Sequence, residues 1–185
     1  MGELRYEEVS KITNSLQDSG KQLPKLKATG ILLAGGKSSR MNKNKAFLEL
    51  EGKPLVERSL TVLQSVFSEV LISSNKPELY AGYEVPVILD GILGRGLLEG
   101  LYQGLKVATY DEVFFVACDI PFLRAELIRF LFSWISAYDV VVLQLQSGLH
   151  PLHAFYHRRC LPLIKNNLEA DRNMVGKHCK VNIKK

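Results

Sequence analysis

The chain has 185 residues, of which 46% are hydrophobic and 23% are charged, and its formal net charge at neutral pH is +5. These values are typical of one globular domain with a substantial core. No apolar run reaches the ~18 residues that span a bilayer, and the polar, acidic N-terminus is unlike a secretory signal. We therefore expect a cytoplasmic protein that makes no contact with a membrane.

Residues 1–27 differ from the rest of the chain. Val9, Ile12 and Leu16 form a weak helical stripe, and the stretch "DSGKQLPKLK" has the composition of a linker. The sequence therefore predicts an N-terminal extension and linker over residues 1–27 and a single domain over residues 28–185.

Short apolar runs alternate with helical patterns from residue 28 onward. Strands are predicted over residues 29–34, 69–75, 85–90, 112–119 and 138–146, with a candidate sixth strand at 153–158. Helices are predicted over residues 54–67, 97–109, 124–138 and 158–169. This alternation predicts an α/β fold with three layers, a mostly parallel sheet covered by helices on both faces.

The loop after the first predicted strand has the composition of a phosphate site. Gly35 and Gly36 allow close backbone approach, and their N–H groups can cradle an anion. Lys37, Arg40, Lys43 and Lys45 follow within a few positions. The spacing matches neither a P-loop nor the dinucleotide fingerprint, and a tight turn with a solvated basic edge is the alternative.

The basic residues of this loop are not interleaved with aromatic side chains. Proteins that bind single-stranded nucleic acid combine basic grooves with aromatic stacking platforms. The composition therefore favours a small anionic ligand and predicts no nucleic-acid partner.

Asp119 closes the buried run "VFFVACD". Ligands of open α/β sheets bind beyond the carboxyl ends of the strands, where such a carboxylate can hold Mg²⁺ over a polyphosphate. The alternative, a helix N-cap, is disfavoured because Pro121 and Phe122 separate Asp119 from the next helix. Cys118 precedes it and should point to the opposite face, into the core.

Other polar residues lie at predicted strand ends. Asp90 ends the third strand, so the turn that follows it is a candidate ligand loop, and a plain helix cap is the alternative. Ser73 and Asn75 lie at the end of the second strand, where they would bind a base or ribose or simply form a turn. His150 and His153 have no carboxylate or cysteine at zinc spacing beside them, so they predict packing or ligand contacts and not a zinc site.

The segment "LAGGKSSRMNKNK" resembles the signature of molybdenum cofactor guanylyltransferases, which reads roughly L-A-G-G-x-S-x-R-M-G-x-x-K. The segment "DIPFL" that begins at Asp119 resembles the D-M/I-P-F-L motif of that family, whose Asp binds the metal. "HPLHAFYHRR" resembles the family's P-L-H-A-L-Y stretch on the acceptor side of the cleft. The resemblance extends over residues 28–158.

The resemblance implies a Rossmann-like nucleotidyltransferase fold and an enzyme that transfers GMP from GTP to molybdopterin, or to its molybdenum-loaded form, with release of pyrophosphate. It implies Mg²⁺ as cofactor, held by Asp119, and transient contact with other molybdenum cofactor proteins. Lys45, Asp119 and Arg40 are the implied catalytic residues. The implied nucleotide-binding residues are Leu33, Ala34, Gly35, Gly36, Lys45, Ser73, Asn75, Asp90 and Asp119.

Two other functions share these features. A related nucleotidyltransferase that uses CTP or makes a sugar nucleotide would have the same fold and loop. The order Ala34-Gly35-Gly36 favours GTP, because the cytidylyltransferases that resemble this family tend to have A-A-G there. A non-catalytic nucleotide-binding protein would bind a triphosphate without turnover.

Overall fold

The computed structural model describes residues 23–34, 45–89, 96–145 and 148–170. The predicted N-terminal helical stripe lies outside these ranges. So do four predicted site residues: Gly35, Gly36, Arg40 and Asp90.

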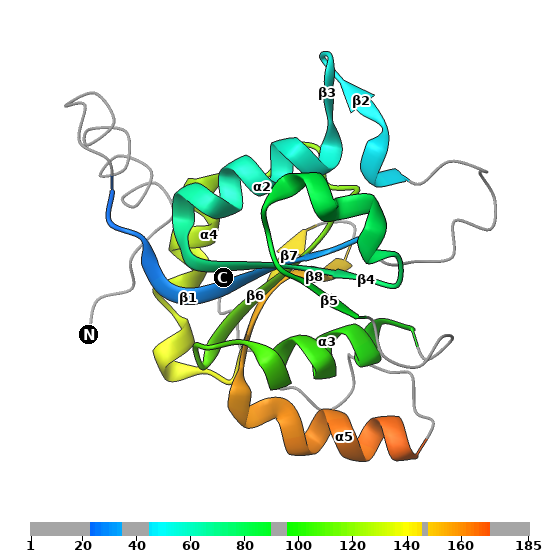
Figure 1. Ribbon diagram of the computed structural model, residues 1–185. Helices are drawn as coiled ribbons and strands as arrows, with labels where there is room; N and C mark the ends of the chain where they lie inside the picture. Colours follow the sequence, from blue (N-terminus) through cyan, green and yellow to red (C-terminus); the bar gives the residue numbers. More distant parts are fainter. Residues whose placement is uncertain (1–22, 35–44, 90–95, 146–147, 171–185) are drawn as a thin grey trace.

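A sheet of six strands forms the centre of the fold, in the order β5-β4-β1-β6-β8-β7 (Figure 1). The strands are β1 (Leu26–Leu33), β4 (Phe67–Ser74), β5 (Val87–Leu89), β6 (Glu112–Ala117), β7 (Val140–Leu145) and β8 (Gly148–His157). β1 pairs in parallel with β4 and β6, and β4 pairs in parallel with β5, whereas β8 is antiparallel to both of its neighbours. The prediction of a mostly parallel sheet is confirmed.

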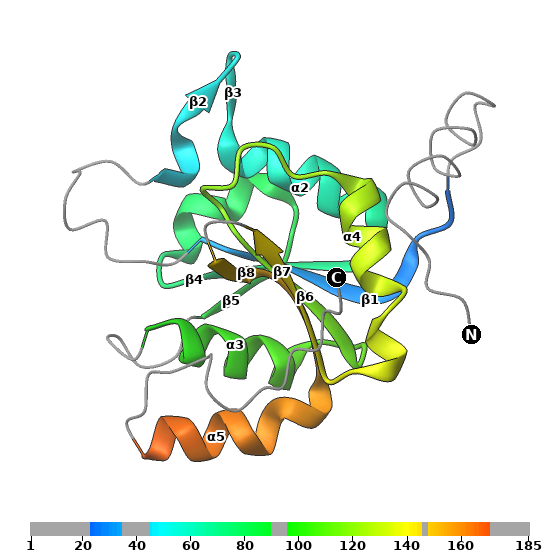
Figure 2. The ribbon, with the colours of Figure 1, turned by 180° about the vertical axis from the view of Figure 1, so that it is seen from behind.

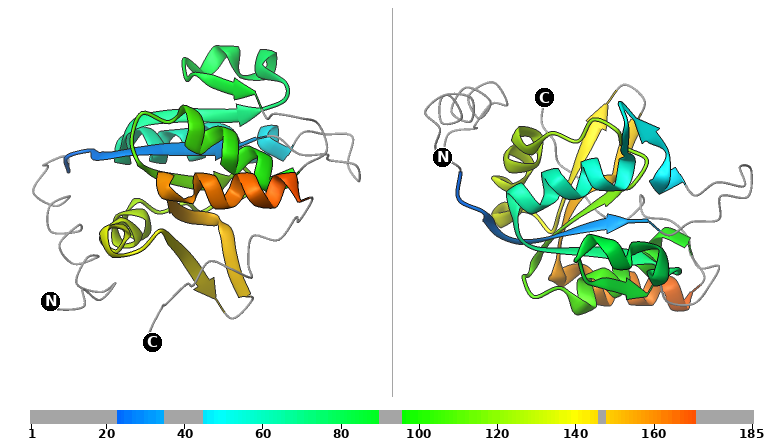
Figure 3. Two further views of the ribbon diagram at one scale, coloured as in Figure 1. Left: turned by 90° about the horizontal axis from the view of Figure 1, so that it is seen from below. Right: turned by 45° about the horizontal axis from the view of Figure 1, so that its top comes forward.

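Helices cover both faces of the sheet and complete three layers. Figures 1 and 2 show α2 (Leu55–Val66) and α4 (Ala125–Phe132) on one face and α3 (Gly96–Val107) and α5 (Leu161–Glu169) on the other. On each face the two helices pack against each other, as α3 and α5 do in the left view of Figure 3. The predicted three-layer α/β fold is therefore confirmed.

Shorter elements connect these layers. A small hairpin of β2 (Glu49–Leu50) and β3 (Lys53–Pro54) precedes α2. Four 3₁₀ helices complete the described elements: η1 (Lys45–Phe47), η2 (Pro77–Tyr83), η3 (Ile135–Ala137) and η4 (Arg158–Cys160).

The core is split by the sheet into two halves. On the α2/α4 side, the ring of Phe114 lies 5.7 Å from that of Phe67 and 4.9 Å from that of Phe155. On the α3/α5 side, the neighbouring residue Phe115 is fully buried with Ile31. Successive strand residues point to opposite faces, so a strand buried on both faces needs the continuous apolar run that the sequence has.

Two predicted elements have boundaries that differ from the structure by five or more residues, and the other main elements differ by up to three. The helix predicted over residues 124–138 ends at Phe132, because N–H groups such as that of Trp134 bond three residues back, to Leu131, and the chain tightens into η3. The candidate strand at 153–158 begins earlier, at Gly148, and its pairing with β7 shifts register between Val142 and Leu143.

The β2–β3 hairpin was not predicted. Its two-residue turn has positive φ at both Glu51 (55°) and Gly52 (75°), as a type I′ turn requires. Gly52 was the available signal, but each strand has only two residues, too few for a recognisable alternation.

The strands that the predicted site requires end at the same edge of the sheet. Leu33 at the end of β1 pairs with Ser73 of β4 and with Ala117 of β6, and Ser74 pairs with Leu89 of β5. The carboxyl ends of four parallel strands therefore lie side by side, which is where open α/β sheets bind ligands.

The carboxylate of Glu69 links β4 to β1 and to the loop before β6, toward the amino ends of these strands. Glu69 of β4 accepts hydrogen bonds from the Thr29 hydroxyl (2.6 Å), the Thr109 hydroxyl (2.6 Å) and the Thr109 backbone N–H (2.8 Å). Burial alone would raise the pKa of Glu69, but these hydrogen bonds and the charge of Arg158 outweigh it, so the pKa lies below its ordinary value of 4.5.

This network gives a pH-dependent prediction. Because the folded-state pKa of Glu69 is lowered, its stabilising contribution is present above about pH 4.5 and is lost as the pH falls through the folded-state value. We expect Glu69→Gln to lower the free energy of unfolding by about 1 kcal/mol at pH 7, since charge-assisted bonds at a partly exposed site are lost. Denaturant titrations at pH 7 and pH 3 should show the difference shrinking at low pH. The exposed Glu78→Gln serves as control, and a difference that stays constant with pH would contradict the assignment.

Within the described ranges, no helix has both the length and the apolar character that a bilayer crossing requires.

Candidate active site

Lys45 and Asp119 meet at the carboxyl edge of the sheet. Lys45 begins η1, and Asp119 lies in the turn that follows β6, 74 positions later in the chain. The lysine Nζ lies 3.4 Å from the aspartate Oδ2, and the two side chains are 50% and 48% exposed. Such an exposed pair contributes little to stability, so both groups are available to a ligand.

The backbone at the end of β1 is held from both sides. The Ala34 N–H donates to the Ser73 carbonyl (2.8 Å), and the Cys118 N–H donates to the Leu33 carbonyl (3.1 Å). Leu33 and Ala34 are buried. The structure therefore brings together predicted nucleotide residues from β1 and β4, and the backbone of Cys118, beside Asp119, holds the end of β1 from the other side.

The two polar residues predicted at the end of β4 have different environments. The Ser73 side chain is buried, whereas Asn75 is exposed just beyond the strand. Of the two, Asn75 presents its side chain to solvent at the sheet edge, and Ser73 contributes the carbonyl that holds Ala34.

Tyr80 is a site residue that the sequence analysis missed. Its hydroxyl donates to the Ala34 carbonyl (3.2 Å), and its ring stacks on that of Phe47 at 5.5 Å. Phe47 ends η1, the element that Lys45 begins. Tyr80 therefore links the end of β1 to the element that carries the lysine. No sequence signal revealed this role, because η2 is a 3₁₀ segment without apolar periodicity.

Cys118 is a poor nucleophile despite its position beside Asp119. Burial, and then the negative charge of Asp119, raise the pKa of its thiol to about 11. The thiol therefore stays protonated at neutral pH, and it packs against the α2/α4 half of the core. This environment agrees with its interpretation as a core residue.

His153 is buried at the register shift of β8. Its ring meets that of Phe114 edge-to-face at 5.3 Å. Burial, and then the nearby His150, lower the pKa of His153 to about 4, so the ring is neutral at pH 7. Among the described residues, no group of three or more histidine, cysteine, aspartate or glutamate side chains could hold a metal ion.

Asp119 is suited to a metal that is bound together with a polyphosphate. Mg²⁺ is usually held by one or two carboxylates plus phosphate oxygens and waters, and not by an all-protein cage. A single, half-exposed carboxylate at the sheet edge fits that pattern.

The family model and the curated relatives agree on one family. The family model of the MobA-like NTP transferase domain matches residues 30–180. A probable molybdenum cofactor guanylyltransferase of Carboxydothermus hydrogenoformans is 39% identical over 147 residues, covering 80% of this chain and 74% of that protein. A molybdenum cofactor guanylyltransferase of Desulfosudis oleivorans is 38% identical over 149 residues, covering 80% and 74%.

A solved structure has the same fold. The crystal structure of molybdopterin-guanine dinucleotide biosynthesis protein A from Archaeoglobus fulgidus has a TM-score of 0.69 to this chain. It is 20% identical, and the match covers 80% of this chain and 76% of that one. At this identity the likeness concerns the fold alone.

Proposed function

Because this chain belongs to the MobA-like NTP transferase domain family, we propose that it transfers GMP from GTP to molybdopterin or to the molybdenum cofactor. The products are the guanine dinucleotide form of the cofactor and pyrophosphate. The names of the curated relatives support this choice of substrates, as does the signature at residues 33–45, which lies within the matched region.

The observation that carries the proposal is the approach of Lys45 to Asp119, 3.4 Å apart at the carboxyl edge of β1 and β6. A carboxylate for a metal and a cation for phosphate oxygens are the groups that nucleotidyl transfer needs side by side. Their half-exposed pair can open to admit an anionic substrate at low cost.

In the proposed reaction, a phosphate oxygen of the acceptor attacks the α-phosphorus of GTP. A new P–O bond joins acceptor and GMP, and the bond from the α-phosphorus to its bridging oxygen breaks. Pyrophosphate leaves with that electron pair. The attacking phosphate is ionised at neutral pH, so the site needs charge neutralisation and in-line positioning more than a strong base.

In this proposal Lys45 stabilises charge on the transferring and leaving phosphates, together with Arg40. The N–H groups of Gly35 and Gly36 hold the triphosphate. Asp119 would hold Mg²⁺, which would supply neutralisation of the phosphate charge.

The base is proposed to bind beside β1 and β4. Leu33 and Ala34 supply backbone and apolar surface there, with Ser73, Asn75 and Asp90 as further contacts. We further propose a cytoplasmic location and transient contact with other proteins of molybdenum cofactor synthesis, since the acceptor and product must be received and passed on.

A substrate panel tests the proposal. Purified protein with molybdopterin and Mg²⁺ should release pyrophosphate with GTP, and release with ATP, CTP or UTP should be at least ~10-fold slower. A coupled pyrophosphate assay measures the rates, with omission of molybdopterin as control. Release with CTP in preference to GTP would overturn the base assignment, and triphosphate binding without any release would indicate a non-catalytic protein.

A further inference from the structure

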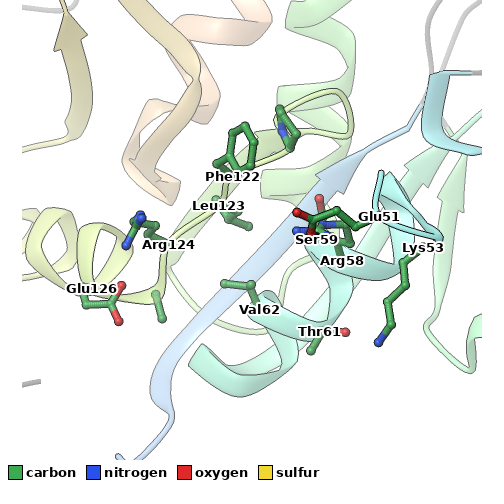
Figure 4. A pocket seen from close by; sticks show the side chains of 12 residues that line it. Glu51, Lys53, Arg58, Ser59, Thr61, Val62, Phe122, Leu123, Arg124 and Glu126 are labelled. Carbon is green, nitrogen blue, oxygen red and sulfur yellow. Dashed lines mark hydrogen bonds and ion pairs between the residues drawn. The ribbon is translucent and has the colours of Figure 1, made fainter. Parts of the chain in front are cut away.

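A groove of about 670 Å³ lies between α2, the β2–β3 hairpin and the segment that leads into α4. Figure 4 shows Phe122, Leu123 and Arg124 on one side of it, with residues of the hairpin and α2, such as Glu51 and Arg58, on the other. The volume is within the range of sites that hold a small organic molecule.

Both walls of the groove follow closely in the chain on the residues of the Lys45–Asp119 site. One wall continues from η1 through the hairpin, and the other is the segment that follows Asp119. Phe122 is three residues beyond Asp119, so their Cα atoms are at most ~10 Å apart even in an extended chain. A molecule whose phosphate lies at Asp119 can therefore reach the groove.

The side chains that line the groove include the exposed ring of Phe122 and the cations of Lys53 and Arg124. Phe122 is 71% exposed, although it is a large apolar side chain. Arg58 is held by the Leu50 carbonyl (3.1 Å) and by Glu51 (2.9 Å). The side chains of Lys53 and Arg124, in contrast, have no hydrogen-bond or ion-pair partner among the residues that the structure describes.

We propose that this groove is the subsite for the ring system of the acceptor, with Phe122 as its stacking surface and Arg124 and Lys53 as its cations. The inference rests on the proposed function. Molybdopterin is a phosphate monoester of a flat pterin that also carries an anionic dithiolene. A flat ring stacks on an exposed aromatic side chain, and the second anionic group suits unpaired cations.

Strand order places the acceptor on this side of Asp119. The proposed base contacts lie on β1 and β4, whereas Phe122 follows β6, which lies on the opposite side of β1 from β4. In-line transfer requires the acceptor and the leaving pyrophosphate on opposite sides of the α-phosphorus. A donor that occupies the β1/β4 side leaves the loop after β6 free for the acceptor.

Steady-state kinetics of Phe122→Ala test the inference, because loss of an acceptor subsite should weaken the binding of molybdopterin and leave the binding of GTP unchanged. We expect KM for molybdopterin to rise about tenfold, the scale of one lost aromatic stacking contact. The Kd for GTP should stay within twofold. Phe122→Tyr should behave as wild type, and Arg124→Gln should raise the acceptor KM. Lys106→Gln on α3, on the far face of the sheet, is the charge control.

Equilibrium binding of molybdopterin in the absence of GTP separates this inference from the proposed function. If the wild-type protein binds molybdopterin more tightly than Phe122→Ala does but shows no turnover, the proposed function is overturned and the proposed subsite is supported. An unchanged acceptor KM in Phe122→Ala, or an equal loss of affinity for GTP, would overturn the subsite. Absence of molybdopterin binding to wild type would overturn both.

Discussion

Asp119→Asn should lower kcat by about 10²-fold or more, the scale of losing one preorganised electrostatic group. The amide keeps the shape of the carboxylate but removes the charge that attracts a metal. Because Asp119 is 48% exposed and its ion pair is long, the free energy of unfolding should change by less than about 0.5 kcal/mol. Pyrophosphate release and a denaturant titration on the same preparation measure the two quantities.

The matched control for this variant is Asp139→Asn. Asp139 also forms an exposed ion pair, with Arg159 at 2.8 Å, but it precedes β7 at the opposite edge of the sheet. It should leave kcat unchanged. A turnover number of Asp119→Asn within threefold of wild type would remove this carboxylate from the reaction.

Lys45→Met should also lower kcat by about 10²-fold, because the variant keeps the unbranched stem of the side chain but lacks the cation that faces the phosphates. GTP affinity should fall as well, since a cation that contacts phosphate acts in the ground state too. Quench-flow measurement of a single turnover, with GTP binding measured separately, divides the loss between binding and chemistry.

Lys165→Met is the control for Lys45→Met, since Lys165 forms a similarly exposed pair with Glu169 on α5 (3.8 Å). The variant that carries both Lys45→Met and Asp119→Asn should lose less than the product of the two single effects, because both groups act on the same phosphates. Full multiplicativity would contradict a shared role.

The three-layer fold could be predicted from the sequence because buried parallel strands leave a clear pattern. The helix predicted over 54–67 differs by one residue at each end from α2, since Pro54 and the apolar spacing mark it well. The end of α4 could not be predicted. Trp134, Ile135 and Tyr138 continue the apolar pattern while the backbone tightens into η3, and periodicity does not distinguish these helices.

Lys45 and Asp119 could be chosen from the sequence for two reasons. Open α/β sheets bind ligands beyond the carboxyl ends of their strands, and the motifs of both residues resemble those of the family. Tyr80 could not, because its role depends on a hydrogen bond to Ala34, 46 positions away, and on a ring contact with Phe47. The start of β8 could not be predicted from the sequence either. Gly148 and Pro151 are poor strand formers, and only the pairing with β6 and β7 makes this segment a strand.

The position of β8 between β6 and β7 constrains how the chain assembles. In the described sheet β7 pairs with β8 alone, yet β7 precedes β8 in the sequence. During synthesis β7 therefore emerges without a neighbour, and β6 keeps one open edge until β8 arrives. We infer that β7 and β8 join the sheet together as a hairpin. Nascent chains that lack β8 would leave β7 unpaired and one edge of β6 open, and unpaired strand edges are templates for aggregation.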